Sequence, residues 1–167
     1  HFDDLHVTCC NLNGPMGLAY IPYVAAMNSR EGPVINLYNQ GEIHFRSPRR
    51  KPGTIAIATD YPVSGDIHMK VSLGGTEKFT LKFRIPEWSK ATTLRINNQE
   101  VSVVPGSYAE ITRKWKAGDE IALSLDMRCR VLDAPHGSNR AGDNFQAVLY
   151  GPLVLARDEN MDKDYNQ

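Results

Sequence analysis

The fold is decided by IHMKVSL at residues 67–73, FTLKFRI at residues 79–85 and IALSLD at residues 121–126. In each of these segments, apolar residues recur at every second position. Side chains alternate between the two faces of a strand, so this period buries one face and leaves the other in water. Turn-forming pairs such as Gly74-Gly75 and Asn97-Asn98 separate the segments. Short strands punctuated in this way predict a mainly β fold, a jelly-roll-like antiparallel β-sandwich.

Further strands are expected on both sides of these segments. Upstream, residues 34–38 are apolar enough to be buried on both faces, and we expect residues 41–45 to pair with them. Downstream, residues 94–97 and 100–104 predict a hairpin around Asn98-Gln99. The other expected strands are residues 54–59, 108–113, 120–127 with a continuation at 129–132, 145–150 and 153–156.

The first 32 residues follow a helical pattern instead. Asn11 or Asn13 is suited to cap a helix, and Pro15 is suited to its first turn. Apolar side chains then recur at helical spacing, and Pro22 is expected to kink this helix or to end its first half. We therefore predict three parts, which are a helical segment at residues 1–32, a β-sandwich domain at residues 33–158 and a polar tail at residues 159–167.

The composition is that of an ordinary globular chain. Of 167 residues, 41% are hydrophobic and 23% are charged. Lys and Arg number 19 and so do Asp and Glu, so the charge balance favours neither nucleic acid nor an anionic membrane as a partner. No apolar run approaches the ~20 residues that span a bilayer. The chain begins at His1 rather than Met, so we expect it to be a piece of a longer protein.

The adjacent residues Cys9 and Cys10 are the strongest chemical candidates. They lie just before the expected helix start, where free N–H groups and the helix dipole favour a thiolate. A thiolate is both a nucleophile and a zinc ligand, and His6 is placed to act as a further ligand, a base or a hydrogen-bond partner. Since a zinc site needs ~4 ligands, these residues do not complete one. The alternative is that both cysteines simply pack in a tight loop.

HVTCCNLNG at residues 6–14, followed by a helix, resembles the double-cysteine segment of glycoside hydrolase family 127, the bacterial β-L-arabinofuranosidases. The resemblance continues in order through nearly the whole chain. It includes VINLY at 34–38, TDYP at 59–62, FRIPEW at 83–88, YAEITRKWKAGD at 108–119 and GPLV at 151–154.

This resemblance implies that residues 1–32 end a catalytic (α/α)-barrel domain and that the sandwich is an accessory domain. It assigns Cys9 as the nucleophile of a retaining mechanism with a thioglycosyl intermediate, and both Cys9 and Cys10 as zinc ligands. The other ligands and the acid/base glutamate would lie upstream in the barrel. This chain alone is then expected to be inactive, although its parent would act on plant-type glycans. A periplasmic or secreted location and a possible homodimer are further expectations.

Weaker candidates lie in the sandwich. Trp88 and Trp115, with Tyr61 and Tyr108, would suit a sugar-stacking platform, although such residues more often fill a core or close the end of a sandwich. Cys129 is expected to be a small buried hydrophobe. The remaining candidates, expected to lie in solvated turns, are Asp126, Asp133, His136 and Asp143.

Two rival roles follow from the same residues. One is a non-catalytic carbohydrate-binding sandwich in which the cysteines are inert. The other is a structural module that braces the barrel or another subunit. In that case the apolar side chains from Met16 to Met27 would pack on the sandwich or on a second copy of the chain.

Overall fold

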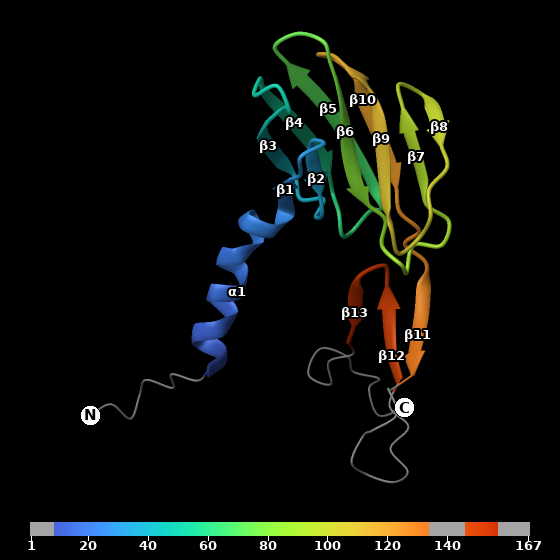
Figure 1. The fold of residues 1–167 in the computed structure, drawn as a ribbon. Coiled ribbons are helices and arrows are strands. Elements are labelled where there is room, and N and C mark those ends of the chain that lie inside the picture. Colours follow the sequence, from blue (N-terminus) through green and yellow to red (C-terminus); the bar gives the residue numbers. More distant parts are fainter. Residues whose placement is uncertain (1–8, 134–145, 157–167) are drawn as a thin grey trace, which may run out of the picture.

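The computed structural model describes residues 9–133 and 146–156, with side chains from residue 13 onward. Its strands form three sheets, ordered β1-β2-β6-β9, β3-β4-β5-β10-β7-β8 and β11-β12-β13 (Figure 1). The elements are α1 (Cys9–Ala25), β1 (Ala26–Asn28), β2 (Pro33–Ile35), β3 (Gly41–Arg46), β4 (Pro52–Thr59), β5 (Asp66–Leu73), β6 (Glu77–Arg84), β7 (Thr93–Ile96), β8 (Gln99–Val101), β9 (Tyr108–Trp115), β10 (Glu120–Ser124), β11 (Cys129–Asp133), β12 (Gln146–Tyr150) and β13 (Leu153–Leu155).

The first two sheets face each other and enclose the core, which confirms the predicted β-sandwich preceded by one helix. Strand β5 buries every second residue, as its sequence predicts. Strand β6 lies between β2 and β9 and is buried more continuously. The fully buried residues with the largest side chains are Trp115, Phe83, Ile35, Ile55, Ile67, Leu81, Ile85, Leu94, Ile121 and Leu123.

The expected pairing of residues 41–45 with residues 34–38 is wrong. Strand β3 pairs with β4 in the six-stranded sheet, with Ile43 opposite Ile55. Strand β2 instead lies between β1 and β6, so both of its edges are occupied. Its pairing with β6 is parallel, with Ile35 opposite Phe83, in a sandwich whose other strand pairs are antiparallel within the described residues.

The helix differs from its prediction at both ends. It begins at Cys9, so that Pro15 lies in its second turn, and it continues through Pro22 to Ala25. Met27 belongs to β1 rather than to the helix. Pro22 is exposed, and the helix ends three residues beyond it. The helix projects from the sandwich (Figure 1). The side chains of residues 13–20 are exposed to solvent. In the described part of the chain, residues 13–20 therefore do not pack on the sandwich, and their packing on a second copy of the chain stays a prediction.

Two turns shift the predicted strand boundaries. The β7–β8 hairpin turns at Asn97-Asn98, whose φ angles of 48° and 65° suit the two-residue turns that join antiparallel strands. Residues 129–132 do not continue β10 but begin the separate β11-β12-β13 sheet. The predicted closing strands around Gly151-Pro152 are confirmed as β12 and β13.

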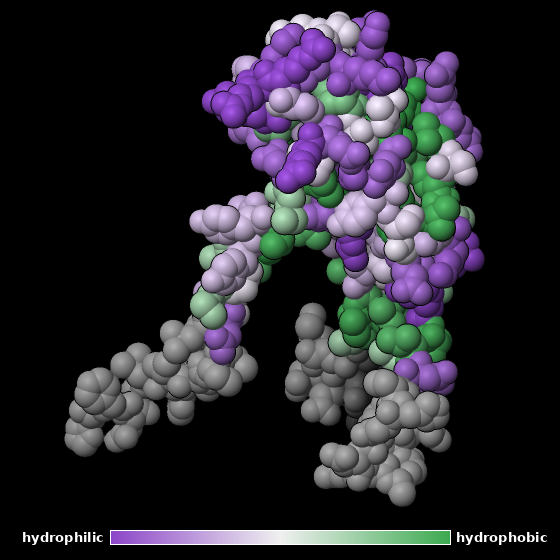
Figure 2. All heavy atoms as spheres, in the orientation of Figure 1, coloured by the Kyte–Doolittle hydropathy of each residue, from purple (hydrophilic) through white to green (hydrophobic). Residues whose placement is uncertain are grey.

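Apolar side chains remain exposed on the helix and on the third sheet. On α1 they include Leu18 and Tyr23, which have 67% and 77% of their residue surface exposed. On the third sheet, Val131 and Val154 are exposed, and hydrophobic atoms gather there below the sandwich (Figure 2). The chain is thus a closed sandwich with two apolar extensions.

Candidate functional site

Cys9 and Cys10 are the first two residues of α1. The N–H groups of a helix's first turn have no partners within the helix, and they favour an anionic sulfur nearby. The first turn carries no acidic residue that would oppose a thiolate. His6 and the side chains of both cysteines lie outside the described residues, so their roles stay predictions.

The other end of α1 is held by the sandwich. The carbonyl of Ala25 accepts hydrogen bonds from the backbone N–H groups of Asn36 at 2.9 Å and Leu37 at 3.1 Å. The Asn36 side chain donates through Nδ2 to the carbonyl of Val24 at 2.9 Å. Tyr108, the first residue of β9, donates its hydroxyl to Asn36 Oδ1 at 2.7 Å. Carbonyls that a helix end leaves without partners are therefore satisfied by the segment after β2 and by β9.

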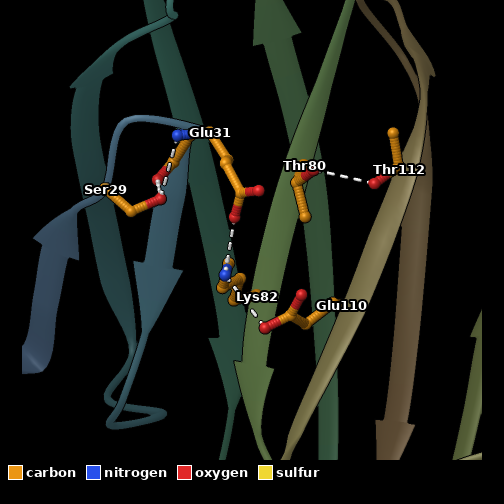
Figure 3. A network of polar contacts seen from close by, with 7 residues as sticks. Ser29, Glu31, Thr80, Lys82, Glu110 and Thr112 are labelled. Atoms are coloured by element: carbon orange, nitrogen blue, oxygen red, sulfur yellow. Dashed lines mark hydrogen bonds and ion pairs between the residues drawn. The ribbon is translucent and has the colours of Figure 1, made fainter.

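A second set of polar contacts fastens the turn between β1 and β2 onto the four-stranded sheet (Figure 3). Lys82 Nζ binds Glu31 at 2.8 Å and Glu110 at 2.9 Å. Hydrogen bonds first to Glu31 and then to Glu110 hold the pKa of Lys82 above its ordinary value. The carbonyl of Glu31 also accepts the Thr80 N–H at 2.9 Å, and Ser29 closes the turn by donating to Gly32 at 2.8 Å. The strand that continues α1 is consequently fixed to the sheet.

Length separates the cysteines from the sandwich. At 1.5 Å per residue, a 17-residue helix places Cys9 about 24 Å along the axis from Ala25. The helix leads away from the sheets over that distance (Figure 1). Side chains clustered at the sandwich end of α1 therefore lie too far from Cys9 to touch a group bound there.

Trp115 is not available as a sugar-stacking residue. Its side chain has no exposed surface, and its indole N–H donates to the carbonyl of Phe79 at 3.2 Å. The guanidinium of Arg113 lies 5.2 Å from the ring centroid. The proposed binding role of Trp115 is corrected to the core role that was its alternative, because a ligand cannot reach the ring face.

Trp88 is half-buried where the sandwich meets the third sheet. The guanidinium of Arg130 lies 5.8 Å from its ring centroid and donates to the carbonyl of Gly151 at 2.7 Å. An added Cβ at Gly151 would touch Trp88 and crowd the Met127 side chain. Trp88 thus packs at a joint between two sheets, and its role in sugar binding stays a prediction.

Burial or hydrogen bonding within the sandwich also involves the tyrosine side chains near this site. Burial raises the pKa of the half-buried Tyr61, and the hydroxyl of Tyr108 is bonded to Asn36. The buried Tyr38 donates its hydroxyl to the carbonyl of Arg84 at 2.7 Å, and burial raises its pKa. The sugar-stacking platform suggested for Trp88, Trp115, Tyr61 and Tyr108 is not assembled as a set, because Trp115 is enclosed in the core and the Tyr108 hydroxyl is bonded to Asn36.

The scattered polar candidates do not form a metal site. Cys129 is exposed at the start of β11, so the expectation that it is buried is wrong. Asp126 binds Arg128 Nε at 2.7 Å, and this hydrogen bond is the main reason why its pKa lies below the ordinary value. Asp133 accepts a hydrogen bond from Gln146, while His136 and Asp143 lie outside the described residues. Across the described ranges, no three His, Cys, Asp or Glu residues lie close enough to hold a metal ion.

An open hollow of about 520 Å³ lies on the outer face of the six-stranded sheet. Ala58 and Ala122 lie on either side of His68, and Lys70 and Arg95 also line the hollow. Small residues at outward strand positions are the sequence signal for it. No Trp, Tyr or Phe lines it, so it lacks the rings on which sugars usually stack.

Asn36 is the functional candidate that sequence reasoning missed. The run VINLY at residues 34–38 is typical of a buried strand, and the lone amide within it was the available signal.

In the described part of the chain, no helix is both long enough and apolar enough to cross a membrane.

Comparisons with known proteins agree on one family. Residues 33–127 match the domain described as "Beta-L-arabinofuranosidase, GH127 middle domain". A GH127 β-L-arabinofuranosidase from Geobacillus stearothermophilus T6 is 29% identical, with a TM-score of 0.77 over 87% of this chain and 23% of that chain. No curated protein sequence matches the chain.

Two further solved structures are similar. One, described as a glycoside hydrolase, is 32% identical with a TM-score of 0.78, over 90% of this chain and 25% of that chain. The other, a GH127 β-arabinofuranosidase, is 28% identical with a TM-score of 0.75, over 87% of this chain and 25% of that chain. The chain spans about a quarter of the length of each of these structures.

Proposed function

Because this chain belongs to glycoside hydrolase family 127, we propose that it is the part of a β-L-arabinofuranosidase-like enzyme that carries the nucleophile and supports it. Cys9 would be the nucleophile, α1 the last helix of a catalytic barrel and the sandwich its accessory domain. The observation that carries the proposal is the direct continuation of a helix beginning with Cys9-Cys10 into the family's middle domain.

The character of α1 supports a place inside a larger domain. Apolar residues occur on all of its sides, including the consecutive residues Leu18 to Ile21, and most of their side chains are exposed. A helix that is apolar all round is ordinarily buried, so neighbouring helices would account for this composition. Among the described residues, the hydrogen bonds from the sandwich to α1 all lie at the C-terminal end of the helix, so the sandwich does not supply these neighbours to residues 13–20.

The chemistry proposed for Cys9 has two steps. Its thiolate attacks the anomeric carbon of the sugar, an S–C bond forms, and the C–O bond to the leaving alcohol breaks as a general acid donates a proton. Water then attacks the same carbon, returns the thiolate and leaves its proton on the same acid/base group. No Asp or Glu occurs between Cys9 and Asn28. As the family resemblance implies, the acid/base residue would come from the part of the barrel upstream of this chain, and this chain alone would not turn over substrate.

Zinc fits this chain only in part. Two adjacent thiols at a helix start are suitable soft donors, but a tetrahedral site needs about two more ligands. Cys10, together with Cys9, would hold the metal, and the remaining ligands would come from outside this chain. When bound, zinc would keep the thiol of Cys9 ionised at neutral pH.

The test uses the full-length enzyme that contains this chain, with p-nitrophenyl β-L-arabinofuranoside as the substrate. Cys9→Ala is expected to lower kcat by at least about a thousandfold, because no other group replaces the nucleophile. Mass spectrometry of the quenched reaction should find the sugar on Cys9, and Cys10→Ala should lose bound zinc.

The matched control is Cys129→Ala, which removes an exposed thiol from β11 and should leave kcat unchanged. If the Cys9→Ala enzyme keeps its activity, Cys9 is not the nucleophile. Activity in the isolated 167-residue chain would show that the acid/base residue lies within it, which contradicts the proposed division of labour.

A further inference from the structure

One chain of side-chain hydrogen bonds reaches the last turn of α1 from the four-stranded sheet. Tyr108 on β9 donates to Asn36, and Asn36 donates to the carbonyl of Val24 in the last turn of the helix. Tyr108 and Asn36 are 72 residues apart, so this connection exists only in the folded sandwich. It runs from a strand of the four-stranded sheet to a helix that otherwise makes few contacts with it.

Two backbone hydrogen bonds act at the same place but constrain less. The N–H groups of Asn36 and Leu37 both reach the carbonyl of Ala25, the last residue of α1. Both bonds converge on one carbonyl, next to the peptide bond through which α1 continues into β1, so they hold the end of the helix at a single point. The Asn36 amide adds a second fixed point on the preceding carbonyl of Val24.

A small tilt at this end becomes a large displacement at the other. Cys9 lies about 24 Å along the helix from Ala25, so a tilt of about 10° moves it by roughly 4 Å. A nucleophile must be held within a fraction of an ångström of its reacting carbon, and a displacement of 1 Å can cost about a hundredfold in rate. The joint is therefore the place where the sandwich has most leverage on the nucleophile.

We propose that Asn36 and Tyr108 are positioning residues for the hydrolysis, which fix the angle of α1 and so the location of the Cys9 sulfur. This inference rests on the proposed function of Cys9, and it gives the middle domain a specific task in the reaction. Neither residue touches the substrate, because both lie at the far end of the helix from Cys9.

An ordinary helix cap would have a different signature. A cap contributes to the stability of the fold, and its loss lowers the fraction of folded enzyme without changing the rate of the molecules that stay folded. A positioning residue changes kcat in folded molecules. Because the sugar-binding groups of the barrel are untouched, KM should change much less than kcat.

The experiment compares Asn36→Ala, Tyr108→Phe and the double variant in the full-length enzyme, with p-nitrophenyl β-L-arabinofuranoside as the probe. Asn36→Ala is expected to lower kcat by about tenfold to a hundredfold, with KM within about threefold of the unmodified enzyme. Tyr108→Phe, which removes only the hydroxyl, should have a smaller effect in the same direction. The double variant should be no worse than Asn36→Ala, because the two residues act in series.

Thr112→Val is the matched control, since it removes the 2.7 Å hydrogen bond between Thr80 and Thr112 on the same sheet without affecting α1. It should shift Tm by an amount similar to Tyr108→Phe and leave kcat unchanged. If Asn36→Ala and Tyr108→Phe lower Tm and neither changes kcat, Asn36 and Tyr108 only cap the helix and the inference is wrong.

Cys9→Ala separates the two proposals. Activity in that variant overturns the proposed function, whereas an inactive Cys9→Ala with a fully active Asn36→Ala overturns the positioning role alone.

Discussion

The sandwich and its two extensions use the same kinds of apolar residues in opposite ways. In the sandwich, Ile67, Val71 and Leu123 have at most 1% of their surface exposed. On α1 and the third sheet, Leu18, Tyr23 and Val154 are each at least 67% exposed. Since apolar burial stabilises a fold by about 25 cal/mol per Å², the sandwich can stabilise itself, and the extensions gain little from this chain. The sandwich therefore has a core of its own, whereas α1 and the third sheet do not bury their apolar residues within the described part of the chain.

The largest expected effect comes from opening the sandwich core. Trp115→Ala removes the largest fully buried side chain and its hydrogen bond to Phe79, and should lower the free energy of unfolding by about 3–5 kcal/mol. Val63→Ala, at a 72% exposed position, should change it by less than about 0.5 kcal/mol. Urea unfolding of the 167-residue chain measures both. Equal effects would mean that Trp115 does not contribute to the core as described.

A substitution on α1 sharpens the contrast between the extensions and the sandwich. Leu18→Ala should change the unfolding free energy of the 167-residue chain by less than about 0.5 kcal/mol, because Leu18 is 67% exposed. In the full-length enzyme, the same change should cost about 2–4 kcal/mol if a barrel buries the helix. Thermal unfolding of both proteins gives the comparison. A negligible effect in both would leave α1 without the neighbours that we propose.

The turn between β1 and β2, which follows α1, is sensitive to substitution of Gly32. Its φ of 143° is one that L side chains rarely adopt, and an added Cβ would collide with the carbonyl oxygen of Thr80. Gly32→Ala should therefore cost about 1–3 kcal/mol of unfolding free energy. Gly14→Ala is the control, because a Cβ there meets nothing within 4 Å. The stability of both variants is measured by chemical denaturation. If Gly32→Ala is as stable as Gly14→Ala, the close approach of Thr80 to Gly32 is refuted.

The smallest expected effect is a loss of stability at alkaline pH. Burial raises the pKa of Tyr38 above its ordinary value of 10.0, so the folded state keeps the phenol neutral while the unfolded chain ionises. The stability that depends on the neutral phenol is complete below pH 10.0 and falls as the pH rises above it.

Tyr38→Phe tests this dependence. It should cost about 0.5–1.5 kcal/mol at pH 7 through the lost hydrogen bond to Arg84, and it should show a shallower decline of stability as the pH rises above 10.0. Tyr61 and Lys82, whose pKa values are also raised, are present in both proteins, so the difference isolates Tyr38. Parallel stability curves in denaturant at several pH values would contradict the assignment.

Local patterns gave reliable strands and unreliable partners. The alternation in residues 67–73 predicted β5, and two predicted hairpins are present, the one expected around Asn98-Gln99, which turns one residue earlier at Asn97-Asn98, and the one around Gly151-Pro152. The pairing of β3 was wrong, because an apolar run does not specify which edge it meets. Trp115 was suggested as a ligand-binding residue because the period of a strand shows that one face is buried but not which face becomes the interior.

For the candidate site, the sequence identified the pair Cys9-Cys10, whose adjacency before a helix is visible without any fold. It did not identify Asn36, whose significance depends on Tyr108 and Val24. These partners come from a different sheet strand and from the helix, and no local spacing relates the three residues.

By itself, the sequence determined the class of fold, the strands with a two-residue period and the family, because those properties are recorded in neighbouring residues. Only the tertiary structure decided that β2 lies beside β6, that Trp115 is enclosed and that β9 holds the end of α1. Such contacts join residues tens of positions apart, and they form when burial of the whole core selects one arrangement among many with similar local preferences.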